Sequence, residues 1–175
     1  EGWVITEPEY VKKYQPGATV PLYFSAVLDR KPESYGSFHG NTQLTDAKES
    51  KGTGAGMYFT FSNEQQEAVT AKIGLSYTSV ENARINLQAE AEGKTFEDAK
   101  EQAHQIWQEY LGRIEVETSK KEDKVKFYTG LYHALLGRGL ANDVNGAYPR
   151  NDVSVGQLPM KEGKPQYNVY NTDAA

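Results

Sequence analysis

The sequence contains no cysteine, which excludes disulfide bonds, thiolate catalysis and cysteine-ligated zinc. It also lacks an excess of basic charge, because 19 Lys and Arg residues stand against 24 Asp and Glu residues. Basic residues gather only in pairs such as Lys12-Lys13, and phosphate binding requires a basic stripe, so nucleic acid is not expected as a partner. No stretch approaches the ~20 apolar residues of a membrane-spanning helix, so no span is expected.

Both ends lack the features of natural termini. The chain begins at "EGWVIT" without a methionine or a signal peptide, and it stops at "YNTDAA" without a helix cap or a charged tail. We therefore expect a segment of a longer protein. Its 175 residues suffice for one domain or two small ones with a buried core.

Aromatic residues are plentiful, with twelve Tyr, six Phe and two Trp. Their faces could pack in a core or stack on the apolar faces of sugar rings, and composition alone favours the core.

The first third of the chain alternates apolar and polar residues, which indicates β-strands over residues 20–29, 56–62 and 67–78. Such strands form an antiparallel sheet with the apolar side inward. The inward set would be Val20, Leu22, Phe24, Ala26, Leu28, Met57, Phe59, Phe61, Val69, Ala71, Ile73, Leu75 and Tyr77. The glycine-dotted segment 39–56 predicts a long mobile loop.

From residue 79 the apolar spacing changes to three and four, which predicts helices over residues 79–93, 95–114 and 119–136. Thr95 and Asp98 have the spacing of a capping box, and so do Ser119 and Glu122. The apolar face of residues 125–136 covers about half of the circumference, so this helix requires partners on two sides. Left uncovered, it would promote self-association. Further on, Asn145-Gly146 predicts the tight primed turn of a hairpin.

Most candidate motifs are weak. "DVNGAYPRND" lacks the third ligand and the glutamate of a calcium loop. His39 and His104 are isolated, and His133 falls on the polar side of its helix. The carboxylate pairs Glu115/Glu117, Glu90/Glu92 and Asp46/Glu49 lie in polar runs typical of solvated surface rather than facing each other across a sugar. Asp173 differs, because it follows an extended aromatic segment and could point into a cavity.

Three ordered blocks together resemble the junction region of glycoside hydrolase family 92, the bacterial exo-acting α-mannosidases. They are "KIGLSYTSVENARINLQAE", "AHQIWQEYLGRIEVE" followed by "KVKFYTGLYHALL", and "DVNGAYPRND" with "YNVYNTDA". The resemblance implies an α+β chain: residues 1–78 the C-terminal part of an antiparallel β-sandwich, 79–118 a helical linker, and 119–175 the first helix and hairpin of an (α/α)6 catalytic barrel.

The resemblance also implies calcium-dependent hydrolysis of α-mannoside oligosaccharides or N-glycans, with inversion, in the periplasm or at the cell surface. The acid, the base and the calcium ligands of the family match no position here. No catalytic or metal-binding residue is therefore assigned, and the chain alone is expected to be inactive.

One site residue carries over. By position, Asp173 matches the aspartate of a Trp-Asp pair whose carboxylate binds hydroxyls of the terminal mannose, a task for which charge-assisted acceptors are suited. Two departures stand out: Thr172 replaces the tryptophan, and Gly137-Arg138 replaces a His-Pro pair. Tyr170, or Tyr167, could supply the missing aromatic face.

Two alternatives remain. A self-contained carbohydrate-binding β-sandwich with a helical appendage predicts sugar affinity in this chain alone. A structural or interaction module predicts none.

Overall fold

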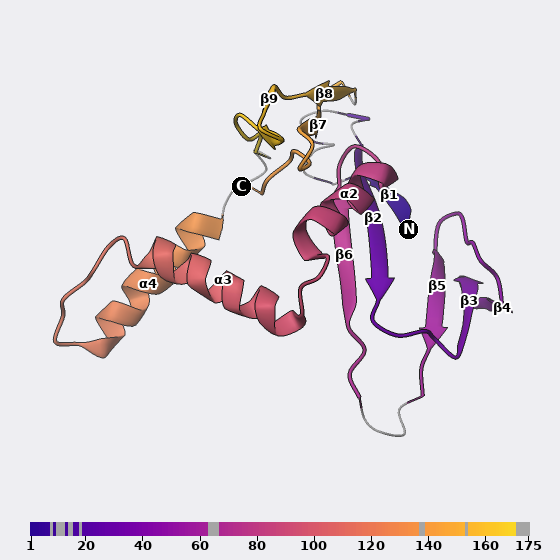
Figure 1. Cartoon of the computed structure of the whole chain (residues 1–175), viewed down its shortest axis with the longest axis horizontal. Helices are drawn as coiled ribbons and strands as arrows, with labels where there is room; N and C mark the ends of the chain where they lie inside the picture. Colours follow the sequence, from indigo (N-terminus) through magenta and orange to yellow (C-terminus); the bar gives the residue numbers. More distant parts are fainter. Residues whose placement is uncertain are drawn as a thin grey trace. The chain divides into compact units, whose positions relative to one another are not determined.

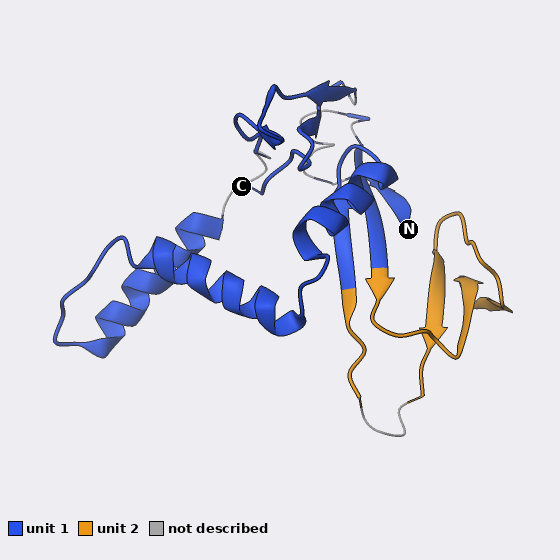
Figure 2. Ribbon diagram, in the orientation of Figure 1, with its two compact units in different colours: residues 1–26, 72–175 blue, residues 27–71 orange. Residues whose placement is uncertain are grey.

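The computed structural model describes residues 1–7, 9, 13, 16–17, 19–62, 67–136, 139–152 and 154–170. The chain divides into two compact units, one of residues 1–26 and 72–175 and the other of residues 27–71 (Figure 2). Most of the antiparallel strands precede the helices along the chain, and short hairpins follow them (Figure 1). The predicted α+β class, with sheets followed by the start of a helical domain, is confirmed.

The first sheet is antiparallel where its pairing is described, and its strand order is β1-β2-β6. Strand β1 spans Gly2–Thr6, β2 spans Val20–Leu28 and β6 spans Ala71–Ser76. Helix α2 (Val80–Ala91) follows β6, and its N-cap is Ser79, whose hydroxyl accepts the backbone N–H of Asn82. This N-cap explains why the period changes from two to 3.6 at this point.

Helix α2 lies close against β6 because Gly74 carries no side chain. A Cβ at Gly74 would overlap the carbonyl oxygen of Ala83 and the side chain of Leu87. Ala83 is fully buried and Leu87 nearly so. At the far end of the helix, Lys72 Nζ donates to the carbonyl of Ala91 at 3.1 Å.

On β6 the face predicted to point inward is the exposed face, so the prediction is wrong for this strand. On β2 the outcome is mixed, because Leu22 of the predicted set is half-buried and Val27 of the opposite face is exposed. Phe24, Ile73 and Leu75 are exposed, whereas Ser25 and Ser76, one residue out of phase, are buried. The physical reason is that α2 approaches β6 over its small side chains. The alternation identified the strands but not the side that a neighbour covers.

The second unit contains a sheet of order β4-β3-β5, with β3 at Ser34–His39, β4 at Thr42–Thr45 and β5 at Ala55–Thr60. Two aromatic rings cover glycines across strands, Phe38 over Gly56 and Tyr58 over Gly36. Such pairs fix the register, because the ring fills the space that the glycine leaves open.

The loop predicted over residues 39–56 is partly a strand. Strand β4 pairs with β3 through a two-residue turn in which His39 faces Thr42 and Gly40 takes a φ of 56°. A glycine at the first turn position suits a hairpin of this length, and this Gly-Asn signal was overlooked. On β5, Phe59 of the predicted inward set is exposed.

The remaining two predicted helices are confirmed. Helix α3 spans Phe96–Leu111 and opens with the complete Thr95/Asp98 capping box, and α4 spans Lys121–Leu136. The Thr118 hydroxyl accepts the N–H of Lys120 just before α4, and the helix begins one residue later than the predicted Ser119/Glu122 box requires.

Helices α3 and α4 lie side by side through aromatic contacts (Figure 1). The rings of Trp107 and Tyr132 have centroids 4.7 Å apart, and the Tyr128 hydroxyl donates to the Ile114 carbonyl at 2.9 Å. Neither helix contains a buried residue, and the apolar face of α4 is open, with Val125 55% exposed. Among the described residues, no helix combines the length and apolar character that crossing a membrane demands.

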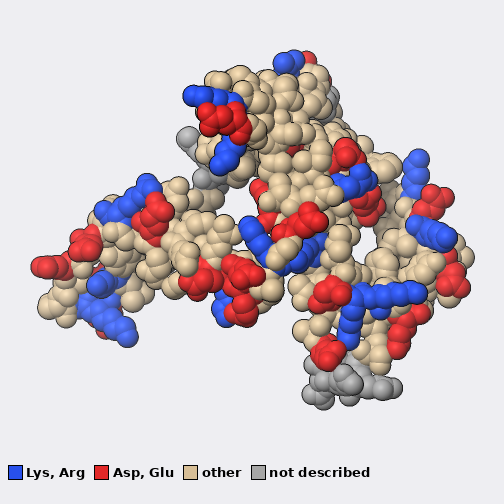
Figure 3. All heavy atoms as spheres, in the orientation of Figure 1, with Lys and Arg blue, Asp and Glu red and all other residues tan. Residues whose placement is uncertain are grey.

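Opposite charges are interspersed on the face drawn in Figure 3. On α3, for example, Lys100 pairs with Glu97 and Arg113 pairs with Glu109, both at 3.0 Å. Exposed pairs of this kind contribute little to stability.

The C-terminal part forms two short hairpins. Strand β7 (Ala147–Pro149) pairs with β8 (Val155–Gln157), and β9 (Met160–Lys161) pairs with β10 (Lys164–Pro165).

The turn at Asn145-Gly146 is not of the primed type that the sequence predicts. Gly146 N–H donates to the Asp143 carbonyl, and Asp143 N–H donates to the Ala147 carbonyl, which closes a three-residue loop with only Gly146 at positive φ. The two-residue turn with both residues at positive φ is Glu162-Gly163, between β9 and β10. The Asn-Gly pair thus marks a turn but not its type.

Candidate functional site

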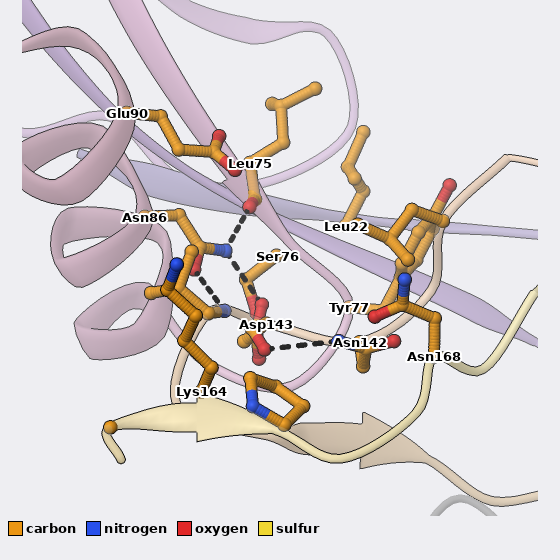
Figure 4. Close-up of a pocket in the computed structure, with 14 residues that line it drawn as sticks. Leu22, Leu75, Ser76, Tyr77, Asn86, Glu90, Asn142, Asp143, Lys164 and Asn168 are labelled. Carbon is orange, nitrogen blue, oxygen red and sulfur yellow. Dashed lines mark hydrogen bonds between the residues drawn. The ribbon is translucent and has the colours of Figure 1, made fainter. Parts of the chain in front are cut away.

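A buried carboxylate, Asp143, connects the end of β6, helix α2 and the loop 141–147, all within one unit. Asp143 is 3% exposed. Its Oδ2 accepts from the hydroxyls of Ser76 at 3.0 Å and Thr78 at 2.5 Å. Its Oδ1 accepts from the Asn86 amide at 2.7 Å (Figure 4). We call these four residues the Asp143 hub. Three donors around one carboxylate satisfy a buried charge.

Two asparagines of α2 extend the hub. The Asn86 amide also donates to the Leu75 carbonyl at 2.8 Å and accepts the N–H of Val144 at 3.0 Å. Asn82 donates to the Thr78 hydroxyl at 2.7 Å and accepts from the Asn145 amide at 2.8 Å. The loop is thereby held on α2 by side-chain hydrogen bonds.

These contacts explain why "DVNGAYPRND" is not a calcium loop. The oxygens of Asp143 accept from the hub donors, and Asn145 Oδ1 accepts the N–H of Ala147 at 3.1 Å. Among the residues that the structure describes, no group of three or more His, Asp or Glu side chains could hold a metal ion. The described part of the chain thus does not fit a calcium ion.

The segment that leads to the predicted sugar-binding residues is bound next to the hub. Asn142 Oδ1 accepts the N–H of Val169 at 2.7 Å, and Ala141 N–H donates to the Val169 carbonyl at 2.8 Å. One residue outward, Leu140 and Tyr170 form an antiparallel bridge. We call these contacts the 140–142/169–170 pairing.

A pocket of about 670 Å³ lies beside the hub (Figure 4). The amides of Asn86 and Asn142 and the Asp143 carboxylate at its wall are already hydrogen-bonded within the protein. The groups that remain for a ligand are the exposed side chains of Glu90, Lys164 and Asn168 and the half-buried ring of Tyr77. A carboxylate, an amide and an aromatic ring are suited to binding sugar hydroxyls and sugar faces.

Of the two residues predicted to bind sugar, Tyr170 lies within the described part of the chain and Asp173 does not. Tyr170 is 52% exposed, and its hydroxyl lies 3.5 Å from the Asn168 amide, which lines the pocket. Asp173 and Thr172 lie outside the described residues, so the role of Asp173 stays a prediction. Tyr167, the second aromatic candidate, is also exposed.

The residues set aside by sequence reasoning are on the surface. His39, His104 and His133 are exposed, as are Glu115 and Glu117. The hub itself was overlooked, since Ser76 fell in the strand phase assigned to solvent. The available signal was the cluster of hydroxyl and amide side chains in "SYTSVEN", next to a strand end, together with "NDVNG".

Comparisons with known proteins place both halves of the chain in one family. Residues 1–76 match the family model of the glycosyl hydrolase family 92 N-terminal domain, and residues 82–174 match that of its catalytic domain. No curated protein matches the chain.

Three solved structures have the same fold over 88% of this chain. They are the GH92 family glycosyl hydrolase ccman5 (TM-score 0.78, 24% identity), a family GH92 inverting mannosidase from Bacteroides thetaiotaomicron VPI-5482 (0.72, 23%) and a family GH92 α-mannosidase from Bacteroides thetaiotaomicron (0.69, 21%). The chain spans about a fifth of the length of each. The Asp143 hub therefore joins Ser76, the last residue of the N-terminal match, to Asn86 and Asp143 of the catalytic match.

Proposed function

Because the chain belongs to glycosyl hydrolase family 92, we propose that it acts within a glycosidase that releases terminal α-linked mannose from oligosaccharides or N-glycans. One observation carries this proposal: the N-terminal and catalytic family models match in order and together cover nearly the whole chain. Two of the similar solved structures are mannosidases, which supports mannose as the sugar. The extended protein, meaning this chain followed by the rest of a family 92 catalytic domain, is the active species.

We further propose that hydrolysis inverts the anomeric carbon. Inversion requires an acid and a base about 6.5–9.5 Å apart, so that a water molecule fits between the base and the sugar. Asp143 does not qualify for either role, because its oxygens are bonded to the hub donors. As the family resemblance implies, we place the acid and the base in the remainder of the catalytic domain.

Within this chain, the proposed task is to hold the sugar. Asp173 accepts hydrogen bonds from two adjacent hydroxyls of the terminal mannose, and Tyr170 offers an aromatic face in place of the tryptophan that Thr172 replaces. The Tyr170 ring is exposed, and its hydroxyl lies close to Asn168, which lines the pocket. Both observations support this role for Tyr170.

The proposed organisation follows the family: a β-sandwich portion to residue 78, a helical linker over 79–118, and the start of the barrel from residue 119. Calcium dependence is proposed for the extended protein. Among the described residues no group of three or more His, Asp or Glu side chains could hold the ion, so we place its ligands in the remainder of the catalytic domain. The periplasm or the cell surface is the proposed location.

Hydrolysis assays of the 175-residue chain and of the extended protein test this function. The substrates are α-mannosides, each assayed with calcium and with a chelator. We expect that only the extended protein cleaves α-mannosides, and that it does so only with calcium. An extended protein that is folded but inert on every α-mannoside would contradict it.

The pocket beside the hub favours a second candidate, a non-catalytic carbohydrate-binding module. This candidate predicts that the 175-residue chain binds mannose oligosaccharides by itself, with weaker binding when Tyr77 is replaced by Ala. Calorimetric titration of the chain with such oligosaccharides separates the two candidates.

A further inference from the structure

Asn142 connects the Asp143 hub to the segment that ends in the proposed sugar-binding residues. It is 8% exposed and uses both ends of its amide. Its Oδ1 accepts the N–H of Val169 at 2.7 Å, and its Nδ2 donates to the Asp143 carbonyl at 3.2 Å. A buried amide with both ends bonded has one orientation and holds its partners at fixed distances.

The contact with Val169 extends a very short backbone ladder. Ala141 and Val169 share one backbone hydrogen bond, and Leu140 and Tyr170 form a single bridge. The side-chain carbonyl of Asn142 supplies a further acceptor. A strand pair with only two or three hydrogen bonds is held weakly. The loss of one of them therefore removes a large part of the interaction that holds residues 169–170.

The other side of the contact is rigid. Asp143 follows Asn142 directly, and its carboxylate is bonded to β6 and α2 through the hub. Val169 is thereby linked through the Asn142 side chain to the end of β6 and to α2.

Chain length shows why this anchor matters. Asp173 is four residues beyond Val169, a reach of about 13 Å for an extended chain. If the whole 140–142/169–170 pairing were lost, the nearest described tie would be the bond from Gln166 N–H to the Pro159 carbonyl, seven residues before Asp173, a reach of about 23 Å. A site that recognises particular sugar hydroxyls requires its carboxylate to be positioned far more precisely than either of these distances allows.

We propose that Asn142 is a positioning residue: it sets the place of Val169 and Tyr170, and through them the sugar-binding segment. This inference rests on the proposed function, in which that segment holds the terminal mannose. Asn142 itself does not touch the substrate.

The test compares three variants of the extended protein. Asn142→Ala loses both amide bonds, and Asn142→Asp keeps an acceptor for Val169. The matched control is Asn145→Ala, which also loses two side-chain hydrogen bonds from the same loop, to Asn82 and Ala147, but none to the segment.

We expect Asn142→Ala to raise KM for an α-mannoside by about tenfold relative to Asn145→Ala, equivalent to ~1.4 kcal/mol, with a smaller change in kcat. Asn142→Asp should restore most of the KM. Equal KM values for Asn142→Ala and Asn145→Ala, at equal folded fractions, would overturn the proposal, because a merely structural role affects both alike.

Amide hydrogen exchange of residues 166–170 gives a readout that does not depend on activity. Exchange at Val169 should accelerate about tenfold in Asn142→Ala and stay unchanged in Asn145→Ala. If the extended protein is inert on every α-mannoside, the proposed function fails and exchange alone decides the positioning role. Unchanged exchange at Val169 in Asn142→Ala overturns that role.

Discussion

Replacing Asp143 by Ala removes the acceptor at which β6, α2 and the loop 141–147 meet. Three donors lose their partner: the hydroxyls of Ser76 and Thr78 and the amide of Asn86. Ser76 and Asn86 are buried, so these donors do not gain full hydration in exchange. We therefore expect a large loss of stability from a change that creates only a small cavity.

Hydrogen bonds to a charged group contribute about 1.5–3 kcal/mol each, so three would sum to about 4.5–9 kcal/mol if they were independent. They are not independent, because they share one carboxylate, and the neighbouring pocket admits water to the vacated space. We expect a loss of about 3–5 kcal/mol in the free energy of unfolding, below the independent sum, because each buried donor left without its partner costs about 1–3 kcal/mol and water reaches part of the vacated space.

The isosteric variant Asp143→Asn separates hydrogen bonding from shape. Its amide oxygen can still accept from Asn86, while its NH2 faces the Ser76 and Thr78 hydroxyls, which can rotate to accept. The expected loss is about 1–2 kcal/mol. Urea unfolding followed by circular dichroism measures both variants. A loss below about 1 kcal/mol in Asp143→Ala would show that the hub does not hold β6, α2 and the loop 141–147 together.

Three further predictions concern other parts of the chain. The Arg84 guanidinium, with the Ser25 hydroxyl, lowers the pKa of Glu1 from 4.5 to about 2. The stabilisation that ionised Glu1 gives the fold is therefore complete above pH 4.5 and is lost as the pH falls toward 2. When stability is measured against pH in acid, Arg84→Ala should show a smaller loss. Gly74→Ala should destabilise by about 1–3 kcal/mol in urea unfolding, because its Cβ overlaps α2, whereas Gly130→Ala, which meets open space, should stabilise α4 by up to about 1 kcal/mol. Val125→Glu should reduce self-association of the chain in sedimentation velocity, while a charge change on the opposite face of α4 should not.

Local rules predicted the helices well. The Thr95/Asp98 box and the three-and-four spacing depend only on residues within one or two turns, so the sequence contains all that determines them. Turn type was less predictable, because Asn145-Gly146 and Glu162-Gly163 are both compatible with a primed turn and the surrounding pairing decides between them.

The covered face of β6 and the hub could not be predicted in the same way. Alternation shows that Ile73 and Leu75 share a face, but only the position of α2 decides which face is covered. The partners of Asp143 are 57 to 67 residues away in sequence, and nothing near Asp143 specifies them. Of the predicted sugar-binding residues, Tyr170 lies near the pocket, and Asp173 remains a prediction.

The stereochemistry of sugar release tests the central claim most directly. Proton NMR of the extended protein acting on an α-mannoside, recorded from the first minutes, identifies the first anomer released before it equilibrates. Free mannose should appear first as the β-anomer, as inversion requires. Mannose appearing first as the α-anomer would contradict inversion, and release of no mannose by a folded extended protein would contradict the proposed function.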